Sequence, residues 1–353
     1  MGRVTCFGKD GTSSCRLRRA GSARRSLPLG AMAGRLLPLL FASLLTPVAR
    51  ADSDRGDAAA PAAVVRADFR VLVDTVLLNV GVYSPEERIE IRLKPSDFVV
   101  YEDGIPRQIT YFAPANTPLS VVLLVDCSQS MSIVALAEAK KAASEFVRQS
   151  HPETQFSIVA FNEKVKRTLD FTTDRLDIES SLSGLQAHGG TRLYDGIREA
   201  IENWDGAQNR ARAIVLLTDG RDEMSDTQLA DVELLLEKND IILFPCGIYS
   251  PAYRRLFLND QKYYIEPAVE KNLNPAWVLR HFAEICGTEA LFPEPGKPLS
   301  EALAGIISEL QHRYLVGFEP GPSLLPGARY RAVEVQLKNR SDVRVQTRKG
   351  YVR

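Results

Sequence analysis

The sequence predicts an α/β fold, in which a doubly wound, mostly parallel sheet is joined by a small β module built from N- and C-terminal strands. Two observations predict it. Between about Pro118 and Arg313, continuous apolar runs alternate with helical patterns, as expected for strands buried on both faces of a parallel sheet. On either side of this region, β-branched and aromatic runs separated by turn residues predominate.

The composition agrees with such a fold and limits the partners. The chain has 353 residues, 45% of them hydrophobic and 25% charged, which suits one large domain and a smaller one. Lys plus Arg (44) balance Asp plus Glu (44), so no broad electric field would attract nucleic acid or anionic lipid. We therefore expect local recognition and no nucleic-acid partner.

Residues 1–51 are predicted to be a leader. Met32 opens a short basic segment, an apolar stretch of 13 residues follows over Leu36–Val48, and Ala49-Arg50-Ala51 ends it. These are the three parts of a secretory signal peptide, so we expect translation to start at Met32 and the protein to be periplasmic or extracellular. The alternative is an uncleaved anchor. No later segment reaches about 18 consecutive apolar residues, so no membrane span is expected in the mature form.

The β module is expected in two parts, residues 68–115 and 314–353, with 52–67 as a flexible linker. Asp103-Gly104 is a hairpin signal, and we expect a second hairpin around Asn339–Asp342. The C-terminal strands should complete the module, because three strands alone leave exposed edges. The predicted strands are Phe69–Tyr83, Phe98–Glu102, Ile109–Phe112, Tyr314–Phe318, Tyr330–Leu337 and Val343–Thr347.

Residues 116–313 are predicted to form the α/β domain. Helical patterns run from Ile133 to Val147, from Ile197 to Trp204 and from Leu229 to Leu236, and Asp174 and Asp226 stand where helix N-caps are expected. The predicted strands are Val121–Val125, Phe156–Phe161, Ala213–Leu217 and Ile241–Phe244, with Arg167–Phe171 as an antiparallel edge.

Three cysteines lie beyond the leader: Cys127, Cys246 and Cys286. This small, odd number excludes a disulfide scaffold and permits at most one bridge, for which Cys246 and Cys286 are the candidates. Three buried free thiols are the alternative.

Five oxygen-bearing side chains follow the ends of predicted strands: Asp126, Ser128, Ser130, Thr191 and Asp219. Ligand sites of doubly wound sheets lie outside the carboxyl ends of the strands, so these residues should converge. Two carboxylates and three hydroxyls suit a hard divalent cation, Mg2+ or else Mn2+ or Ca2+. Asp-x-Ser-x-Ser alone is also compatible with a helix-capping loop, and the three segments together favour the metal site.

Here the sequence resembles a known family. Residues 119 to about 292 are similar to a von Willebrand factor A (VWFA) domain, and the five residues match its metal-ion-dependent adhesion site one by one. Asp97–Gly104 and Arg348–Tyr351 resemble stretches of the VWFA-related family described from Acidobacteria. The resemblance implies metal-dependent binding of a protein or surface ligand without catalysis. Gln129 departs from the pattern, because A domains commonly carry Gly there.

Residues near the predicted site leave alternatives open. Arg192 and Arg221 could attract an acidic ligand, or could be solvated loop residues. His188 is expected to be a loop histidine, since Mg2+ prefers oxygen. The aromatic segment from Tyr249 to Trp277 could supply binding hot spots, or could pack on itself over the sheet edge.

The expected function is an exported, non-enzymatic binding protein that docks a partner's carboxylate through the cation. One alternative is a structural envelope module whose metal site is vestigial. A hydrolase is less favoured, because the four histidines show no triad-like arrangement around Ser128 or Ser130, and His-Glu-x-x-His is absent.

Overall fold

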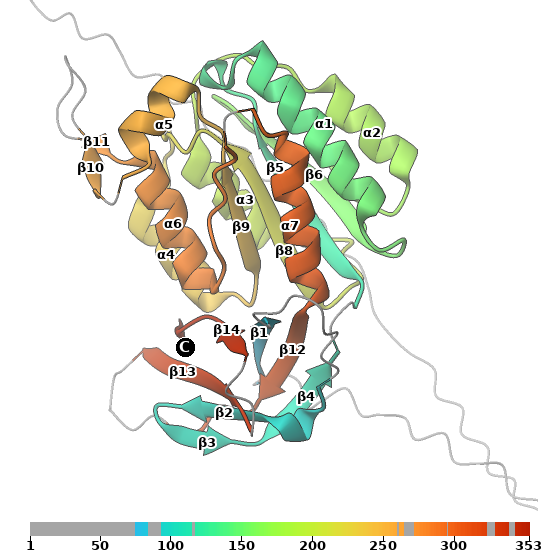
Figure 1. Ribbon diagram of the computed structural model, residues 1–353, viewed down its shortest axis with the longest axis vertical. Helices are drawn as coiled ribbons and strands as arrows, with labels where there is room; N and C mark the ends of the chain where they lie inside the picture. The colour runs from blue at the N-terminus through green and yellow to red at the C-terminus, as the bar shows by residue number, and fades with distance from the viewer. Residues whose placement is uncertain are drawn as a thin grey trace, which may run out of the picture. The chain divides into compact units, whose positions relative to one another are not determined.

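The computed structural model describes the chain in eight stretches (Figure 1). The predicted leader and linker, the strand segment before residue 75 and the Asn339–Asp342 turn lie outside the described residues. The stretches are 75–83, 93–114, 117–259, 261–264, 272–294, 296–322, 329–338 and 343–353.

The centre of the fold is a five-stranded sheet in the order β7-β6-β5-β8-β9. Four strands are parallel, and β7 pairs antiparallel to β6, as predicted. The middle strand, β5, is buried along almost its whole length, because sheet neighbours flank it and helices cover both its faces. The strands are β5 (Leu119–Asp126), β6 (Gln155–Phe161), β7 (Val165–Thr172), β8 (Ala211–Thr218) and β9 (Ile242–Gly247).

Helices cover both faces of this sheet, which makes the fold doubly wound (Figure 1). Alternate residues of β5 point to opposite faces: Val121, Leu123 and Val125 join one core, and Val122 and Leu124 join the other. The first core lies under α1 (Ile133–Gln149), α2 (Arg175–Gly184) and α7 (Leu299–Gln311). The second lies under α3 (Leu193–Glu202), α4 (Leu229–Lys238) and α6 (Pro275–Cys286).

The two predicted N-caps have different outcomes. Asp174 caps α2, since its carboxylate accepts the backbone N–H groups of Leu176 and Asp177. The prediction for Asp226 is wrong, because the N-cap of α4 is Gln228. The backbone N–H of Asp226 donates to Asp195 instead, which holds this residue in the loop before the helix.

The remaining strands form two four-stranded antiparallel sheets, ordered β14-β1-β12-β4 and β15-β13-β2-β3. Each sheet combines strands from both ends of the sequence, and residues of both line one hydrophobic core that includes Val80, Val100, Phe318 and Tyr351. The strands are β1 (Val76–Tyr83), β2 (Phe98–Glu102), β3 (Ile105–Arg107), β4 (Ile109–Ala113), β12 (Arg313–Phe318), β13 (Tyr330–Leu337), β14 (Arg344–Gln346) and β15 (Gly350–Val352). This is the predicted β module.

Its turns and pairings only partly follow the prediction. Asp103 and Gly104 turn between β2 and β3 with φ of 50° and 77°, as the Asp-Gly signal indicates. The expected pairing of the last two predicted strands with each other is wrong: β14 pairs with β1, and β13 pairs with β2 and β15. The reason is that β1 and β2 belong to different sheets, so successive C-terminal strands extend different N-terminal ones.

The β module contacts the amino end of the central sheet around Asp240, which closely precedes β9. Arg348 forms an ion pair with the Asp240 carboxylate and donates to the Leu77 carbonyl oxygen at 3.0 Å. The Leu77 backbone N–H donates to Asp240 Oδ2 at 3.3 Å. These contacts occupy the end of the sheet opposite the predicted metal site.

Cys127, Cys246 and Cys286 are free and buried, so the candidate bridge between Cys246 and Cys286 is not formed. Burial raises the pKa of each thiol to about 12, which makes them unreactive at neutral pH. In the part of the chain that the structure describes, no helix combines the length and the apolar character needed to cross a bilayer.

Candidate metal site

The sheet itself places the predicted site residues. Asp126 is the last residue of β5, and Asp219 directly follows β8, its neighbour in the sheet. Ser128 and Ser130 belong to the turn between β5 and α1, and Thr191 precedes α3 by two residues. Because β5 and β8 are parallel, their carboxyl ends meet at one edge, where the loops deliver the three hydroxyls.

Hydrogen bonds join the Asp126 carboxylate to its own loop and to the next strand. Its Oδ1 accepts the Ser128 backbone N–H at 2.8 Å, and its Oδ2 accepts the Thr218 hydroxyl at 2.6 Å. The hydroxyl oxygens of Ser128 and Ser130 lie 3.0 Å apart. The structure therefore brings the three polar residues of Asp-x-Ser-x-Ser into contact.

Two neighbouring carboxylates give the site its electrostatic character. Burial and, to a smaller extent, the nearby Asp219 carboxylate raise the pKa of Asp126 to about 7, although hydrogen bonds from Ser128 and Thr218 lower it. The hydrogen bonds that the Asp126 carboxylate accepts from described residues come from Ser128 and Thr218, and neither donor is a basic side chain. A cation bound between the two carboxylates would relieve both the burial cost and the repulsion.

Thr191 supplies a buried hydroxyl that lacks a partner. The residue is 1% exposed, and its Oγ1 makes no hydrogen bond to any described residue. Its carbonyl oxygen accepts the backbone N–H groups of Glu223 and Met224, both at 3.0 Å, which ties it to the loop after Asp219. Native proteins rarely leave a buried hydroxyl unpaired, so this oxygen suits a ligand.

The loop that carries Ser128 and Ser130 forms without the glycine common in A domains. Gln129 begins a right-handed 3-10 turn, its side chain is exposed, and its backbone N–H donates to the Gly189 carbonyl oxygen at 3.0 Å. Gly189 has φ of 73°, and a Cβ there would overlap the Glu163 carboxylate. The position that requires glycine is therefore in the neighbouring loop.

Asp195 is a positioning residue that the sequence analysis missed. Its carboxylate accepts the Thr227 hydroxyl at 2.7 Å, the Thr227 backbone N–H at 3.0 Å and the Arg192 guanidinium at 2.8 Å. Desolvation raises the pKa of Asp195, but these hydrogen bonds outweigh it and lower the pKa to about 2. Asp195 thus holds the loop after β8 beside Thr191. The feature of the sequence that could have indicated this role is an Asp in the first turn of a helix.

Arg192 and Arg221, the two arginines near the predicted site, both make specific contacts and are not simple solvated residues. Arg192 forms ion pairs with Asp195 and Asp226, both at 2.8 Å, so its charge is already offset. The Arg221 guanidinium lies over the Tyr253 ring, 4.4 Å from its centroid. His188 is exposed, with Nδ1 3.4 Å from Glu163 Oε1, as expected of a loop histidine.

The aromatic segment from Tyr249 to Trp277 packs on itself. It contains α5 (Pro251–Phe257) and the short strands β10 (Tyr263–Tyr264) and β11 (Asn272–Leu273). Phe257, Tyr264 and Ala276 form a small core of their own, and the Phe257 and Tyr264 rings pack edge to face at 4.9 Å. This favours the self-packed interpretation for most of these aromatic side chains.

Comparison with known proteins finds a family match for part of the chain. Residues 121–221 match the von Willebrand factor type A domain family. Uncharacterized protein sll0103 from Synechocystis is 31% identical over 112 residues, which cover 31% of this chain and 27% of that protein. Mouse inter-alpha-trypsin inhibitor heavy chain 4 is 27% identical over 135 residues, covering 34% of this chain and 14% of the relative. The matches thus span under a third of either relative's length.

Parts of this chain also align with solved structures. A von Willebrand factor type A structure from Catenulispora acidiphila aligns at 14% identity with a TM-score of 0.45, covering 79% of this chain and 73% of the other. Proximal thread matrix protein 1 from the mussel byssus, solved with a zinc-occupied MIDAS motif, aligns at 14% identity with a TM-score of 0.44, covering 59% and 49%. On the family match and the doubly wound sheet, the chain contains a von Willebrand factor type A domain.

Proposed function

We propose that this protein is an exported, non-enzymatic binding protein whose A domain docks an acidic group of a protein or surface partner through a divalent cation. The observation that carries the proposal is a pair of neighbouring buried carboxylates and an unpaired buried hydroxyl at one sheet edge. Asp126 and Asp219 are buried close together, and the Thr191 hydroxyl has no partner among the described residues. A cation would satisfy these groups at once.

The ligand set favours Mg2+, with Mn2+ and Ca2+ as alternatives. Asp126, Ser128, Ser130, Thr191 and Asp219 offer only oxygen atoms, which are the ligands that hard cations prefer. Three of the five are neutral hydroxyls, so the bound cation would keep much of its positive charge. A carboxylate of the partner would complete the coordination shell, which makes an acidic group the expected docking element.

The surroundings of the two serines support binding over catalysis. A nucleophilic serine needs a positioned base, yet the hydrogen bonds of Ser128 and Ser130 join them to each other and to Asp126. In the described part of the chain, His188 and His281 instead contact Glu163 and Glu233. Export is proposed from the signal-peptide pattern after Met32.

Calorimetric titration of Mg2+ tests the proposal in two variants of the same chain. The wild type should bind one Mg2+, and Asp126→Ala should not. Affinity capture from envelope extract should then recover a partner only from wild type with Mg2+, and EDTA should release it. If both variants hold the same partner with and without Mg2+, the cation is irrelevant to docking and the site is vestigial.

A further inference from the structure

A cavity of about 400 Å3 lies at the same edge of the sheet as the candidate metal site. It opens where β9 ends, between the start of α5, the start of α7 and one face of α1. Its lining is mixed and combines apolar residues such as Ile248, Pro251 and Leu299 and the Tyr249 ring with charged side chains, among them Glu138 on the α1 side. Its volume falls in the range of pockets that enclose small organic groups.

Direct contacts connect this cavity to the metal site. The Ile248 backbone N–H donates to the Thr218 carbonyl oxygen at 2.8 Å, one residue before Asp219. The Arg221 guanidinium, two residues after Asp219, lies 4.4 Å from the centroid of the Tyr253 ring in α5, and the first residue of α5, Pro251, lines the cavity. A group bound at the cation and a group bound in the cavity would therefore be neighbours.

Exposed apolar side chains lie between the two on the α1 side. The helix begins three residues after Ser130, and its first two side chains, Ile133 and Val134, are 84% and 70% exposed. Val134 precedes Glu138 by four residues, so the two lie on one face of α1, and Glu138 lines the cavity. Two exposed apolar side chains thus lie on α1 between Ser130 and Glu138 along the chain.

The charges of the cavity offset one another. Glu294 pairs with Lys297 at 3.2 Å, and Arg254 donates to the carbonyl oxygens of Phe292 and Pro293. With Glu138, the lining carries two acidic and two basic groups. The cavity therefore complements a neutral, apolar group, in contrast to the cation site beside it.

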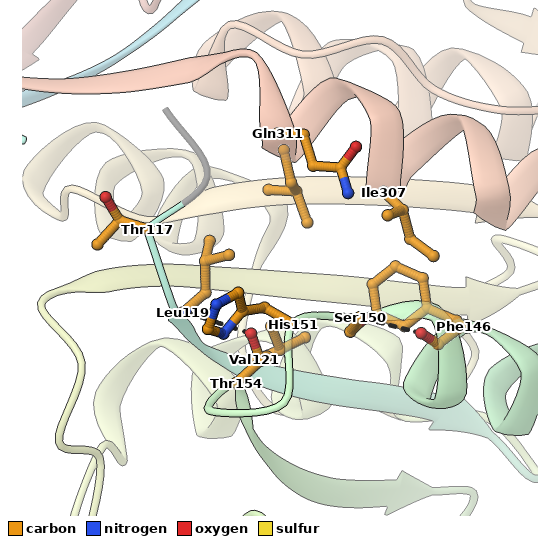
Figure 2. Close-up of a pocket in the computed structure, with 10 residues that line it drawn as sticks. Thr117, Leu119, Val121, Phe146, Ser150, His151, Thr154, Ile307 and Gln311 are labelled. Atoms are coloured by element: carbon orange, nitrogen blue, oxygen red, sulfur yellow. Dashed lines mark hydrogen bonds between the residues drawn. The ribbon is translucent and has the colours of Figure 1, made fainter. Parts of the chain in front are cut away.

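A second cavity is too small to bind a side chain, in contrast to the first. It lies at the opposite end of the sheet between β5, α1 and α7, where Leu119, Val121, Phe146 and Ile307 point inward (Figure 2). It holds only about 30 Å3, enough for about one water molecule and too little for a side chain.

We infer that the cavity lined by Ile248, Tyr249 and Leu299 is a second subsite, which takes a large apolar side chain of the segment whose carboxylate binds the cation. The partner is thus a polypeptide with an acidic residue close in sequence to an aromatic or long aliphatic one. This inference rests on the proposed function and adds a specificity that the metal cannot provide.

Seven labelled peptides test it by fluorescence anisotropy. Each has nine residues with a central Asp in a Gly/Ser background; six carry one Phe, placed one, two or three positions before or after the Asp, and the seventh carries Ala. In Mg2+, at least one Phe peptide should bind wild type about tenfold more tightly than the Ala peptide, because the ring is buried.

Substitutions at the mouth of the cavity assign the effect. Glu138→Trp places an indole at the entrance from an exposed helix position, and should reduce the Phe advantage to less than about threefold while the Ala peptide binds as before. Glu138→Gln, the matched control, should keep the full advantage. Val134→Ser should reduce it partly.

Several results would overturn the inference. Mg2+-dependent binding without a Phe preference would remove the subsite and leave the proposed function standing. A Phe advantage that persists in Glu138→Trp would place the ring elsewhere. Binding of none of the peptides, or Mg2+-dependent self-association in sedimentation velocity that Glu138→Trp abolishes, would also exclude it, the latter in favour of a second copy of the chain.

Discussion

Among the residues that the structure describes, Glu102 and Asp126 are carboxylates with no exposed surface, and their surroundings are opposite in charge. Glu102, in the β module, contacts two guanidinium groups, from Arg107 at 2.7 Å and Arg331 at 3.0 Å, and accepts the Tyr351 hydroxyl at 2.6 Å. Asp126, in the A domain, accepts only one hydroxyl and one backbone N–H from the described residues, with a second carboxylate nearby.

The difference distinguishes a structural charge from a functional one. A buried charge is tolerated when opposite charges and hydrogen bonds satisfy it, as around Glu102. Asp126 has no such cationic partner among the described residues. Glu102 holds the fold together, and under the proposed function a bound cation would be the missing partner of Asp126.

The largest effect is expected from Glu102→Ala. This change removes the carboxylate partner of the partly buried Arg107, leaves the buried Arg331 with Asp103 as its remaining partner, and deprives the Tyr351 hydroxyl of its acceptor. The free energy of unfolding should fall by about 3–5 kcal/mol. Urea unfolding followed by circular dichroism measures it. Glu334→Ala, which removes an exposed carboxylate of the same module, should change stability by less than about 0.5 kcal/mol. Equal effects of both would show that Glu102 is not structural.

Asp126→Asn should behave in the opposite way. Without metal, the free energy of unfolding should stay constant or rise by about 1 kcal/mol, because a buried charge near Asp219 is removed. Mg2+ affinity should fall by at least about 100-fold, or about 2.7 kcal/mol, in calorimetric titration. A loss of metal-free stability of more than about 2 kcal/mol would place Asp126 with Glu102 and contradict the comparison.

Asp195 is an intermediate case, a nearly buried carboxylate with several donors, and it predicts a pH dependence. Its pKa of about 2 lies below the unfolded value of about 3.9, so its stabilisation is present above pH 4 and is lost as the pH falls through 2. Asp195→Asn should therefore lower the free energy of unfolding by about 2 kcal/mol at pH 7 and change it little near pH 2.

The control for Asp195→Asn is Asp205→Asn, at an exposed position. The difference in free energy of unfolding between Asp205→Asn and wild type should be the same at every pH in this range. Denaturant unfolding at five or six pH values gives both curves. A difference for Asp195→Asn that does not shrink toward low pH would mean that its charge does not stabilise the loop after β8.

The smallest effects are expected at Thr191. Thr191→Val removes a hydroxyl without a described partner, so metal-free stability should rise by up to about 1 kcal/mol, while Mg2+ affinity falls about tenfold. Thr227→Val, the matched control, removes a hydroxyl that donates to Asp195 at 2.7 Å and should cost about 1 kcal/mol. Unchanged Mg2+ affinity in Thr191→Val would exclude this residue as a ligand.

Much of the fold could be predicted, because its signals are local. Buried parallel strands such as β5 and β8 produce continuous apolar runs, and their common direction brings Asp126 and Asp219 to one edge. The N-cap at Asp174 depends on backbone groups two and three residues away. In such cases the interacting groups lie close together in the sequence, so a local pattern is enough to predict them.

What could not be predicted depends on contacts between distant residues. The partner of β14 is β1, and no local pattern distinguishes it from the adjacent β13. Asp226 is of a residue type favoured at helix N-caps, but its backbone N–H donates a hydrogen bond to Asp195, 31 residues earlier. For the same reason the resemblance to a family identified the stretches that contain Glu102 and Tyr351, yet could not show that they touch.

The hydrogen bond between Tyr351 and Glu102 has a consequence for the order of folding. It joins residues 249 positions apart, and β2 also pairs with β13, so the β module cannot close until nearly the whole chain has left the ribosome. The A domain between them contains its own cores and can fold earlier. Until then the N-terminal strands have unpaired edges, which makes this interval the point at which the chain is most exposed to aggregation and to proteases.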